Sequence, residues 1–166
     1  MKSMIDLKVE QIGIIKTPYK DSAPYQPIDN DKNEFIIELN EEYIEGIKDL
    51  QKFNFIYVFF YMHRMKEKVK MTISPSWAEG ENIGIFASRS PVRPNPIGLS
   101  IVRIKKIDGN KIFTSCLDVF DGTPLLDIKP YIKDLDEKSN ANYGWIDTVD
   151  DKEHLAMHIK GIPHNH

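Results

Sequence analysis

Cysteine is almost absent from this chain of 166 residues, which contains only Cys116. An intrachain disulfide is therefore impossible, and nothing in the composition points to an oxidising compartment. Long apolar runs are also missing, because the longest, residues 53–62, is far too short to span a bilayer. Charges interrupt residues 1–11, which lack the apolar segment of a signal peptide. These absences predict a soluble cytoplasmic protein without a membrane segment.

Two common phosphate-binding motifs are absent as well. The sequence has no G-x-G-x-x-G after its first predicted strand and no G-x-x-x-x-G-K-[ST], which argues against a Rossmann-type nucleotide site and against a P-loop. The formal net charge of −3 at pH 7 argues against a protein that coats nucleic acid, because such binders carry a basic balance. It leaves room for a local basic patch.

The most distinctive segment, residues 83–99, holds two arginines and three prolines between short apolar runs. Each proline fixes its own φ and pushes the preceding residue out of the helical region, so the backbone through Ser90, Arg93 and Asn95 is stiff and extended. A stiff loop can hold guanidinium, amide and hydroxyl groups in place for a carboxylate, a phosphate or a base edge. The simpler interpretation is a proline-rich turn between strands with solvated arginines.

A second polar segment, residues 118–131, gathers three carboxylates, a lysine and a tyrosine around a Gly-Thr-Pro turn. Alone, it is a common turn whose aspartates cap backbone amides. Combined with the arginines of the proline loop, it would offer anions and cations together. A zwitterionic nucleoside ligand would use both.

A histidine and an arginine follow directly after the apolar run of residues 53–62. His63 and Arg64 could face a pocket mouth, although a structural hydrogen bond is the simpler interpretation for His63. If a strand continued beyond them, basic side chains at every second position would share one face, either as a solvated surface or as phosphate contacts. These are Arg64, Lys66, Lys68 and Lys70.

The C-terminal tail is rich in histidine. His154 and His158 would share a helix face, and His164 and His166 could complete a metal shell. Spacing alone is weak evidence for such a site, and terminal segments are often loosely ordered. We therefore assign no metal ligands.

Short β-branched and aromatic runs separated by turn residues predict about seven strands, and hence a mainly β sandwich or barrel. One amphipathic helix is predicted after Asn40, which would cap it, with apolar residues at helical spacing up to Leu50. Residues 53–62 predict a strand that is buried on both faces. Asp108-Gly109 predicts a two-residue hairpin.

Taken together, the two polar segments resemble those of one known family, the TsaA-like (TrmO) tRNA methyltransferases. The likeness rests on residues 86–100, F-A-S-R-S-P-V-R-P-N-P-I-G-L-S, and on residues 118–131, D-V-F-D-G-T-P-L-L-D-I-K-P-Y. Residues 11–20, Gln26-Pro27 and residues 59–63 are similar as well, so it extends over residues 9–145.

The resemblance implies a mainly β fold, a small closed or partly open β barrel of about seven strands with one packed helix and no Rossmann domain. It implies one domain over residues 5–147 and leaves a histidine-rich C-terminal extension over residues 148–166.

Proteins of this family bind S-adenosyl-L-methionine as homodimers and methylate N6 of threonylcarbamoyl-adenosine next to the tRNA anticodon. The resemblance implies the same cofactor, a homodimer and the tRNA anticodon loop as partner. Carried over position by position, the cofactor contacts fall on Gln26, Pro27, Ile28, His63, Arg64, Arg89, Leu99, Ser115, Cys116, Leu117 and Asp118. Ile28 departs from the small residue expected at its position.

The chemistry of this transfer assigns roles to several residues. Arg89 suits an anionic group, either the cofactor carboxylate or the threonyl carboxylate. Asp127 and Tyr131 are the candidate catalytic residues, as acceptors of the N6 proton. The basic side chains from Arg64 to Lys70 are candidate contacts for the anticodon-stem phosphates. The alternatives are a methyltransferase of the same build with another RNA or small-molecule acceptor, and a non-catalytic cofactor-sensing or RNA-binding β barrel.

Overall fold

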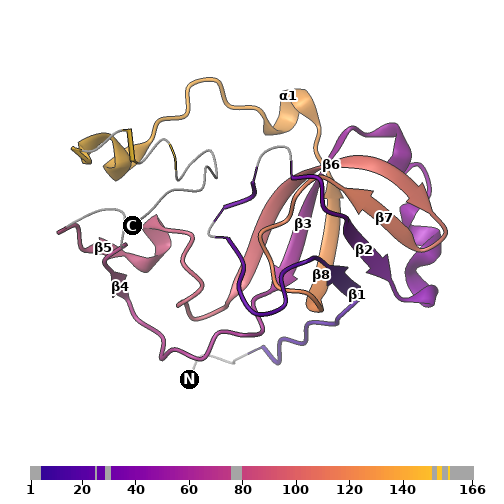
Figure 1. Cartoon of the computed structure of the whole chain (residues 1–166), viewed down its shortest axis with the longest axis horizontal. Coiled ribbons are helices and arrows are strands. Elements are labelled where there is room, and N and C mark those ends of the chain that lie inside the picture. Colours follow the sequence, from indigo (N-terminus) through magenta and orange to yellow (C-terminus); the bar gives the residue numbers. More distant parts are fainter. Residues whose placement is uncertain are drawn as a thin grey trace.

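A computed structural model describes residues 5–24, 26–28, 31–75, 80–150, 153–154 and 157. Its centre is a closed antiparallel barrel of six strands (Figure 1). The strands are β1 (Gly13–Lys16), β2 (Phe35–Leu39), β3 (Phe55–Tyr61), β6 (Ile97–Asp108), β7 (Lys111–Thr114) and β8 (Thr123–Pro130). They follow the order β1-β2-β7-β6-β3-β8, and β8 closes the barrel by pairing with both β3 and β1. The predicted mainly β barrel is confirmed.

Shorter elements surround the barrel. A separate two-stranded sheet joins β4 (Thr72–Ile73) to β5 (Ile83–Gly84) and lies to one side of the barrel (Figure 1). The helical turns are η1 (Glu41–Ile47), η2 (Leu50–Lys52), η3 (Ile85–Ala87) and η4 (Gly144–Thr148), which are 3₁₀, and α1 (Lys133–Asp136). The indole N–H of Trp145 donates to the carbonyl of Ala87 at 2.8 Å and joins η4 to η3.

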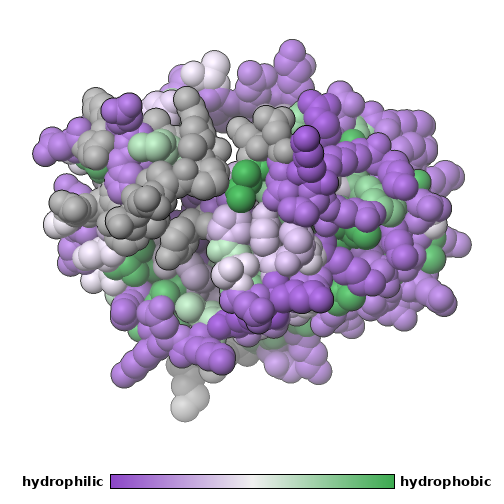
Figure 2. Space-filling view, viewed as in Figure 1, coloured by the Kyte–Doolittle hydropathy of each residue, from purple (hydrophilic) through white to green (hydrophobic). Residues whose placement is uncertain are grey.

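The barrel interior is mainly aliphatic, with the rings of Phe35 and Phe60 among the aliphatic side chains, because alternate residues of each strand point inward. In β3, Ile56, Val58 and Phe60 are buried, whereas Tyr57 and Phe59 on the other face are only half-buried. The prediction that this strand is buried on both faces is therefore wrong. A barrel has a single interior, so the outward aromatic residues form part of its wall. On the face shown in Figure 2, hydrophilic residues cover most of the barrel and apolar ones form small separate patches.

The predicted hairpin is confirmed, with its turn shifted by one residue. Asp108 pairs with Lys111, so the two-residue loop is Gly109-Asn110, and Gly109 has a φ of 57°. Glycine adopts this left-handed conformation without steric cost. The Asn110 side-chain amide donates to the Leu39 carbonyl at 2.7 Å, which ties the hairpin to β2.

The predicted helix after Asn40 forms as two 3₁₀ segments instead of an α-helix. The Asn40 side chain makes no cap hydrogen bond and donates to the Gln11 carbonyl at 3.3 Å. Gly46 lowers helix propensity, and Asp49 has a left-handed φ of 66° that ends the run. The apolar side nevertheless packs on the core, where Leu50 is buried.

The strands β3 and β5 are each followed by a turn. The strand β3 ends at Tyr61, and the chain then turns, with the N–H of His63 donating to the Tyr61 carbonyl at 2.8 Å. Residues 64–71 form no strand, so the basic side chains there do not share a strand face. The strand β5 stops at Gly84, and the chain continues as the helical turn η3.

Close contact between β3 and β6 constrains Gly98. Gly98 pairs with Phe60, and a Cβ at this position would lie 2.0 Å from ring atom Cε2 of Phe60. We predict that Gly98→Ala lowers the free energy of unfolding by roughly 2–3 kcal/mol, because the ring must move within a packed interior. Urea denaturation measures this loss. Gly84→Ala is the matched control, since nothing lies within 4 Å of the place that its added methyl group would occupy, and equal effects at both glycines would contradict the packing.

Candidate functional site

Three connections of the barrel, including the two longest, lie at one end. Because neighbouring strands are antiparallel, the segments after β1, β3 and β7 leave from the same rim to which β2, β6 and β8 return. Hydrogen bonds join these segments: the Thr17 hydroxyl donates to the Val119 carbonyl at 2.8 Å, and the N–H of Asp121 donates to the Tyr19 carbonyl at 2.8 Å. The motif segments that are far apart in the sequence therefore meet here.

Asp118 and Arg89 bring the two motif segments together. The Ser100 hydroxyl hydrogen-bonds to the Asp118 carboxyl, and the guanidinium charge of Arg89 acts on the same group. Burial outweighs both influences and raises the pKa of Asp118 to about 6. Ser100 is buried and Arg89 is exposed. The rim thus holds a partly buried carboxyl close to a solvent-accessible cation.

The two arginines of the proline loop have different roles. The Arg93 guanidinium donates to the carbonyls of Ser88 and Ser90 at 3.0 and 3.3 Å, so it braces the loop from within. Within the described residues, Arg89 makes no such hydrogen bond to the loop and no ion pair, and its charge acts on Asp118. Of the two, Arg89 is therefore the side chain that the loop presents outward.

A brace of polar side chains fixes the loop that contains Gln26, Pro27 and Ile28. The N–H of Ile28 donates to Cys116 Sγ at 3.3 Å, and the Tyr19 hydroxyl lies 3.8 Å from the same sulfur. Burial raises the pKa of the Cys116 thiol, so it is neutral at pH 7. The loop and residue 116 are consequently held side by side.

Asp31 anchors the other end of this brace. It accepts a hydrogen bond from the Tyr19 hydroxyl at 2.8 Å on one oxygen, and from the N–H and side-chain amide of Asn33 at 2.9 and 2.7 Å on the other. Burial, followed by the contact with Asp31, raises the pKa of Tyr19. Tyr19 therefore stays a neutral hydrogen-bond donor.

The end of β3 also joins this rim. The Arg64 guanidinium donates to the Lys20 carbonyl and lies 4.4 Å from the ring centroid of Phe120. Burial, and then the charge of Arg64, lowers the pKa of His63, which favours a neutral imidazole. Arg64 therefore packs against the rim and does not continue a basic stripe.

Three other residues expected to bind the cofactor lie in different surroundings. Ser115 lies beside Cys116, and its hydroxyl accepts the N–H of Arg103 at 2.9 Å. Leu117 is fully buried in the barrel core, so its side chain supports the rim from below. Leu99 is 44% exposed and pairs with Phe59 on the outer face, opposite to its neighbour Ser100.

Asp127 and Tyr131 lie on the outer wall of the barrel. Asp127 forms an ion pair with Lys129 at 2.7 Å, and the Tyr131 ring lies 5.5 Å from that of Tyr57. No hydrogen bond or ion pair within the described residues joins either of them to Asp118. The structure thus separates the two expected proton acceptors from the polar rim.

Sequence reasoning missed Ser100, Tyr19, Asp31 and Asn33. Only the alternation of β6, which turns Ser100 inward, offered a local signal. Within the described residues no group of three or more histidine, cysteine or acidic side chains could hold a metal ion, and His158, His164 and His166 lie outside them. None of the helices in that same part of the chain has the length and apolar character needed to cross a membrane.

The fold and the rim define a class of protein: a small antiparallel barrel that collects ligand-type polar groups at one end, without a parallel sheet or a glycine-rich nucleotide loop. Residues 14–137 match the family model of the tRNA-methyltransferase O N-terminal domain. The chain belongs to this family.

Several relatives support this assignment. A probable S-adenosyl-L-methionine-binding protein of Pyrococcus abyssi is 41% identical over 82% of this chain and 74% of its own length. The tRNA (adenine(37)-N6)-methyltransferase of Escherichia coli is 34% identical over 78% of this chain, but the match spans only 59% of that enzyme. A crystal structure of TrmO from Pseudomonas aeruginosa superimposes with a TM-score of 0.69 at 28% identity, covering 84% of this chain and 62% of that chain.

The raised pKa of Asp118 gives a prediction for stability. Its folded-state pKa of about 6 lies above the ordinary value of about 4, so folding favours the protonated carboxyl and ionisation costs stability as the pH rises through this window. We predict that Asp118→Asn is more stable than the parent protein by about 2 kcal/mol at pH 7 and that this gain disappears below about pH 4. Urea unfolding at several pH values measures the difference, with Asp134→Asn as the exposed control. A gain independent of pH would contradict the burial of a titrating carboxyl.

Proposed function

We propose that this protein uses S-adenosyl-L-methionine to methylate N6 of a threonylcarbamoyl-adenosine beside the tRNA anticodon, in the cytoplasm. The observation that carries the proposal is the convergence of Arg89, Ser100 and Asp118 with the Ile28–Cys116 contact at one rim of the barrel. Membership of the tRNA-methyltransferase O family and the activity for which the Escherichia coli relative is named support it.

The groups at this rim match the chemistry of the cofactor. When bound, S-adenosyl-L-methionine supplies a methyl group activated by a positively charged sulfur. A sulfonium favours nearby oxygen atoms and a site with little water, and a carboxylate favours a guanidinium. Asp118 and Arg89 offer these partners, and the neutral Cys116 and Ile28 offer an apolar wall.

We extend the proposal to the wider set of contacts. Gln26, Pro27 and Ile28 would bind from the braced loop, and His63 and Arg64 from the end of β3. Ser115, Cys116 and Asp118 would bind from the connection between β7 and β8. Leu117 and Leu99 would bind through their backbone, because the Leu117 side chain is buried in the core and that of Leu99 faces outward.

Proton removal requires an acceptor near the reacting nitrogen. A general base is most effective when its pKa lies near the working pH, and Asp118 has a pKa of about 6. We therefore assign proton acceptance to Asp118 in place of Asp127 and Tyr131. The outer-wall position of those two residues would bring them to the substrate only if RNA lay along β8.

Alignment is the remaining requirement. Methyl transfer is an in-line displacement, so its rate depends on how well the reacting atoms are held. Arg93 braces the proline loop from within, which lets the loop act as a rigid platform. The target base would enter extruded from a single-stranded loop, where its edges are accessible.

The proposal is tested with the purified chain, S-adenosyl-L-methionine and tRNA that bears or lacks the threonylcarbamoyl group. We expect calorimetric binding of the cofactor and a mass increase of one methyl group in the modified nucleoside only. Methylation of tRNA lacking the group would assign another acceptor. Cofactor binding without transfer would indicate a cofactor sensor, and folded protein that binds no cofactor would overturn the proposal.

Arg89→Ala separates the two possible anionic partners. If Arg89 binds the cofactor carboxylate, we expect the dissociation constant of the cofactor to rise about 10- to 100-fold, because a charge-assisted hydrogen bond is worth roughly 1.5–3 kcal/mol. If it binds the threonyl carboxylate, KM for the modified tRNA rises and cofactor affinity stays unchanged. Lys52→Ala, an exposed cation on the connection at the opposite end of the barrel, is the control. No change in either quantity would remove Arg89 from the site.

We also propose that a second copy of the chain covers the outer wall of β3 and β6. Apolar side chains pair there across the two strands, and Ile97, Leu99 and Ile101 are 45%, 44% and 52% exposed. A two-fold contact sets one patch against its own copy, and Arg103 with the Asp127–Lys129 pair would form its polar rim.

Analytical ultracentrifugation tests this contact. We expect a dimer at micromolar concentration and a monomer for Ile101→Asp, because the introduced carboxylate would be buried without a partner. Val69→Asp, at another exposed apolar position, should stay dimeric. A monomeric parent protein, or dissociation by both substitutions, would contradict the proposed interface.

A further inference from the structure

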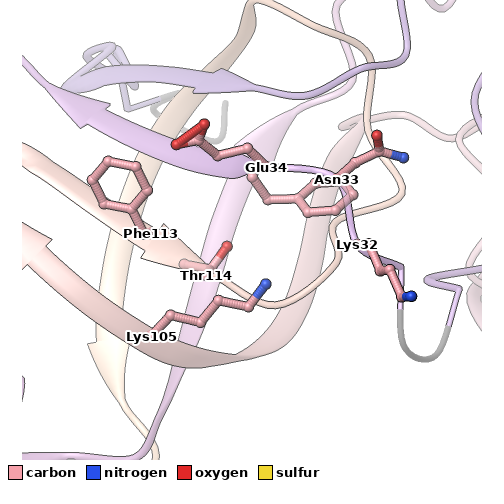
Figure 3. A pocket seen from close by; sticks show the side chains of 7 residues that line it. Lys32, Asn33, Glu34, Lys105, Phe113 and Thr114 are labelled. Carbon is pink, nitrogen blue, oxygen red and sulfur yellow. The ribbon is translucent and has the colours of Figure 1, made fainter.

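A second polar feature lies on the same rim, beside β2 and β7. It is a surface pocket of about 310 Å³ to which Lys32, Asn33, Glu34, Lys105, Phe113 and Thr114 contribute (Figure 3). Phe35 and Thr114 pair at the rim ends of β2 and β7. The pocket, here named the lysine pocket, is therefore next to the candidate site; it shares Asn33 with the brace described above and uses none of the candidate cofactor contacts.

A β-bulge in β6 places a lysine in this pocket. The register with β7 shifts between Ile104 and Lys106, so Lys105 is the extra residue without a pairing partner. Strict alternation would send one of the two adjacent lysines inward, but the bulge leaves both exposed. Lys106 lies 4.1 Å from the ring centroid of Phe113, whereas Lys105 lines the pocket.

Neither lysine of the pocket is neutralised by an ion pair. Among the described residues, Lys32 and Lys105 take part in none of the salt bridges. Asp31 lies close to Lys105, but both of its oxygens already accept hydrogen bonds, from Tyr19 and Asn33. Within the described residues, both lysines that line the pocket are thus without an ion-pair partner.

Glu34 is the acidic member of the lining. Its carboxylate lies on the side of Phe113, away from the Lys32 ammonium, while the Lys105 ammonium points toward the Thr114 hydroxyl (Figure 3). The Glu34 carboxylate therefore lies apart from both ammonium groups (Figure 3). The part of the lining that Lys32, Asn33 and Lys105 contribute is suited to an anion.

We infer that the lysine pocket binds a backbone phosphate of the RNA substrate. Two ammonium groups and a side-chain amide suit a phosphate, which they can hold without reading sequence. A pocket lined mainly by polar groups at the surface differs from the apolar clefts that enclose small molecules. A backbone phosphate of an RNA strand that passes over the rim fits both the basic side chains and the polar lining of this surface pocket.

The connections of the pocket explain why a phosphate held there would matter. Asn33 bonds to Asp31, which bonds to Tyr19 beside Cys116. On the other side the Thr114 hydroxyl donates to the Ser115 carbonyl at 2.9 Å. Both walls of the pocket therefore lead directly into the candidate site. The inference rests on the proposed function and moves the expected phosphate contacts from the Arg64–Lys70 segment to this side of the rim.

The double variant Lys32→Glu and Lys105→Glu tests the inference, with a tRNA transcript as the probe and fluorescence anisotropy at several salt concentrations. We expect affinity to fall roughly tenfold or more, and the slope of log K against log salt to decrease by about 1 for each lost contact. Cofactor affinity should not change, because neither lysine belongs to the candidate cofactor site. Lys48→Glu combined with Lys133→Glu is the control of equal charge change at exposed positions outside the pocket.

The outcomes separate this inference from the proposed function. If the parent protein methylates tRNA and the pocket variant keeps its affinity and salt slope, the inference is wrong and the function stands. Equal losses in the pocket and control variants would show general electrostatic attraction and would also overturn it. Inorganic phosphate is the second probe: stabilisation by phosphate that needs both lysines, with unchanged RNA affinity, would assign the pocket to a free anion. A parent protein that binds neither cofactor nor tRNA would refute the function and the inference together.

Discussion

Closure of the barrel is the constraint on which the rest of the structure depends. Because β8 pairs with both β1 and β3, six antiparallel strands form a ring in which every second connection lies at the same rim. The two longest connections, from β1 to β2 and from β3 to β6, fall there together with the one from β7 to β8. In an open sheet of the same strands these connections would lie in a row along one end, whereas closure draws the row into a ring and brings the separate sequence motifs together.

Rigidity at this rim comes from hydrogen bonds between connections, since few regular elements are present there. Thr17 bonds to the segment that follows Leu117, Tyr19 links Asp31 to Cys116, and Arg93 fastens the proline loop to its own carbonyls. Most of these partners are neutral or become neutral through burial. A polar group in a poorly solvated place costs free energy when its hydrogen bond is not formed. These bonds can therefore hold the loops of the site in position without a helix or sheet beneath them.

Electrostatics divides the rim into two parts. A carboxyl with a pKa of about 6 lies near Arg89 at one part, and the other is lined by two lysines that form no ion pair with any residue that the structure describes. Between them runs the brace from Tyr19 through Asp31 to Asn33. A ligand with a cationic centre and a polyanion can therefore be held at neighbouring places on one small barrel whose net charge is −3.

The sequence by itself determined the barrel class, the hairpin near Gly109 and the family, because strand periodicity, turn residues and contiguous motifs are local patterns. Only the tertiary structure decided that Arg93 braces while Arg89 is presented, that Asp127 faces outward, and that Lys105 enters a pocket through a bulge. Those outcomes depend on strand register and on which loops meet at the rim. Both are set by pairings between residues far apart in the chain, which no local pattern encodes.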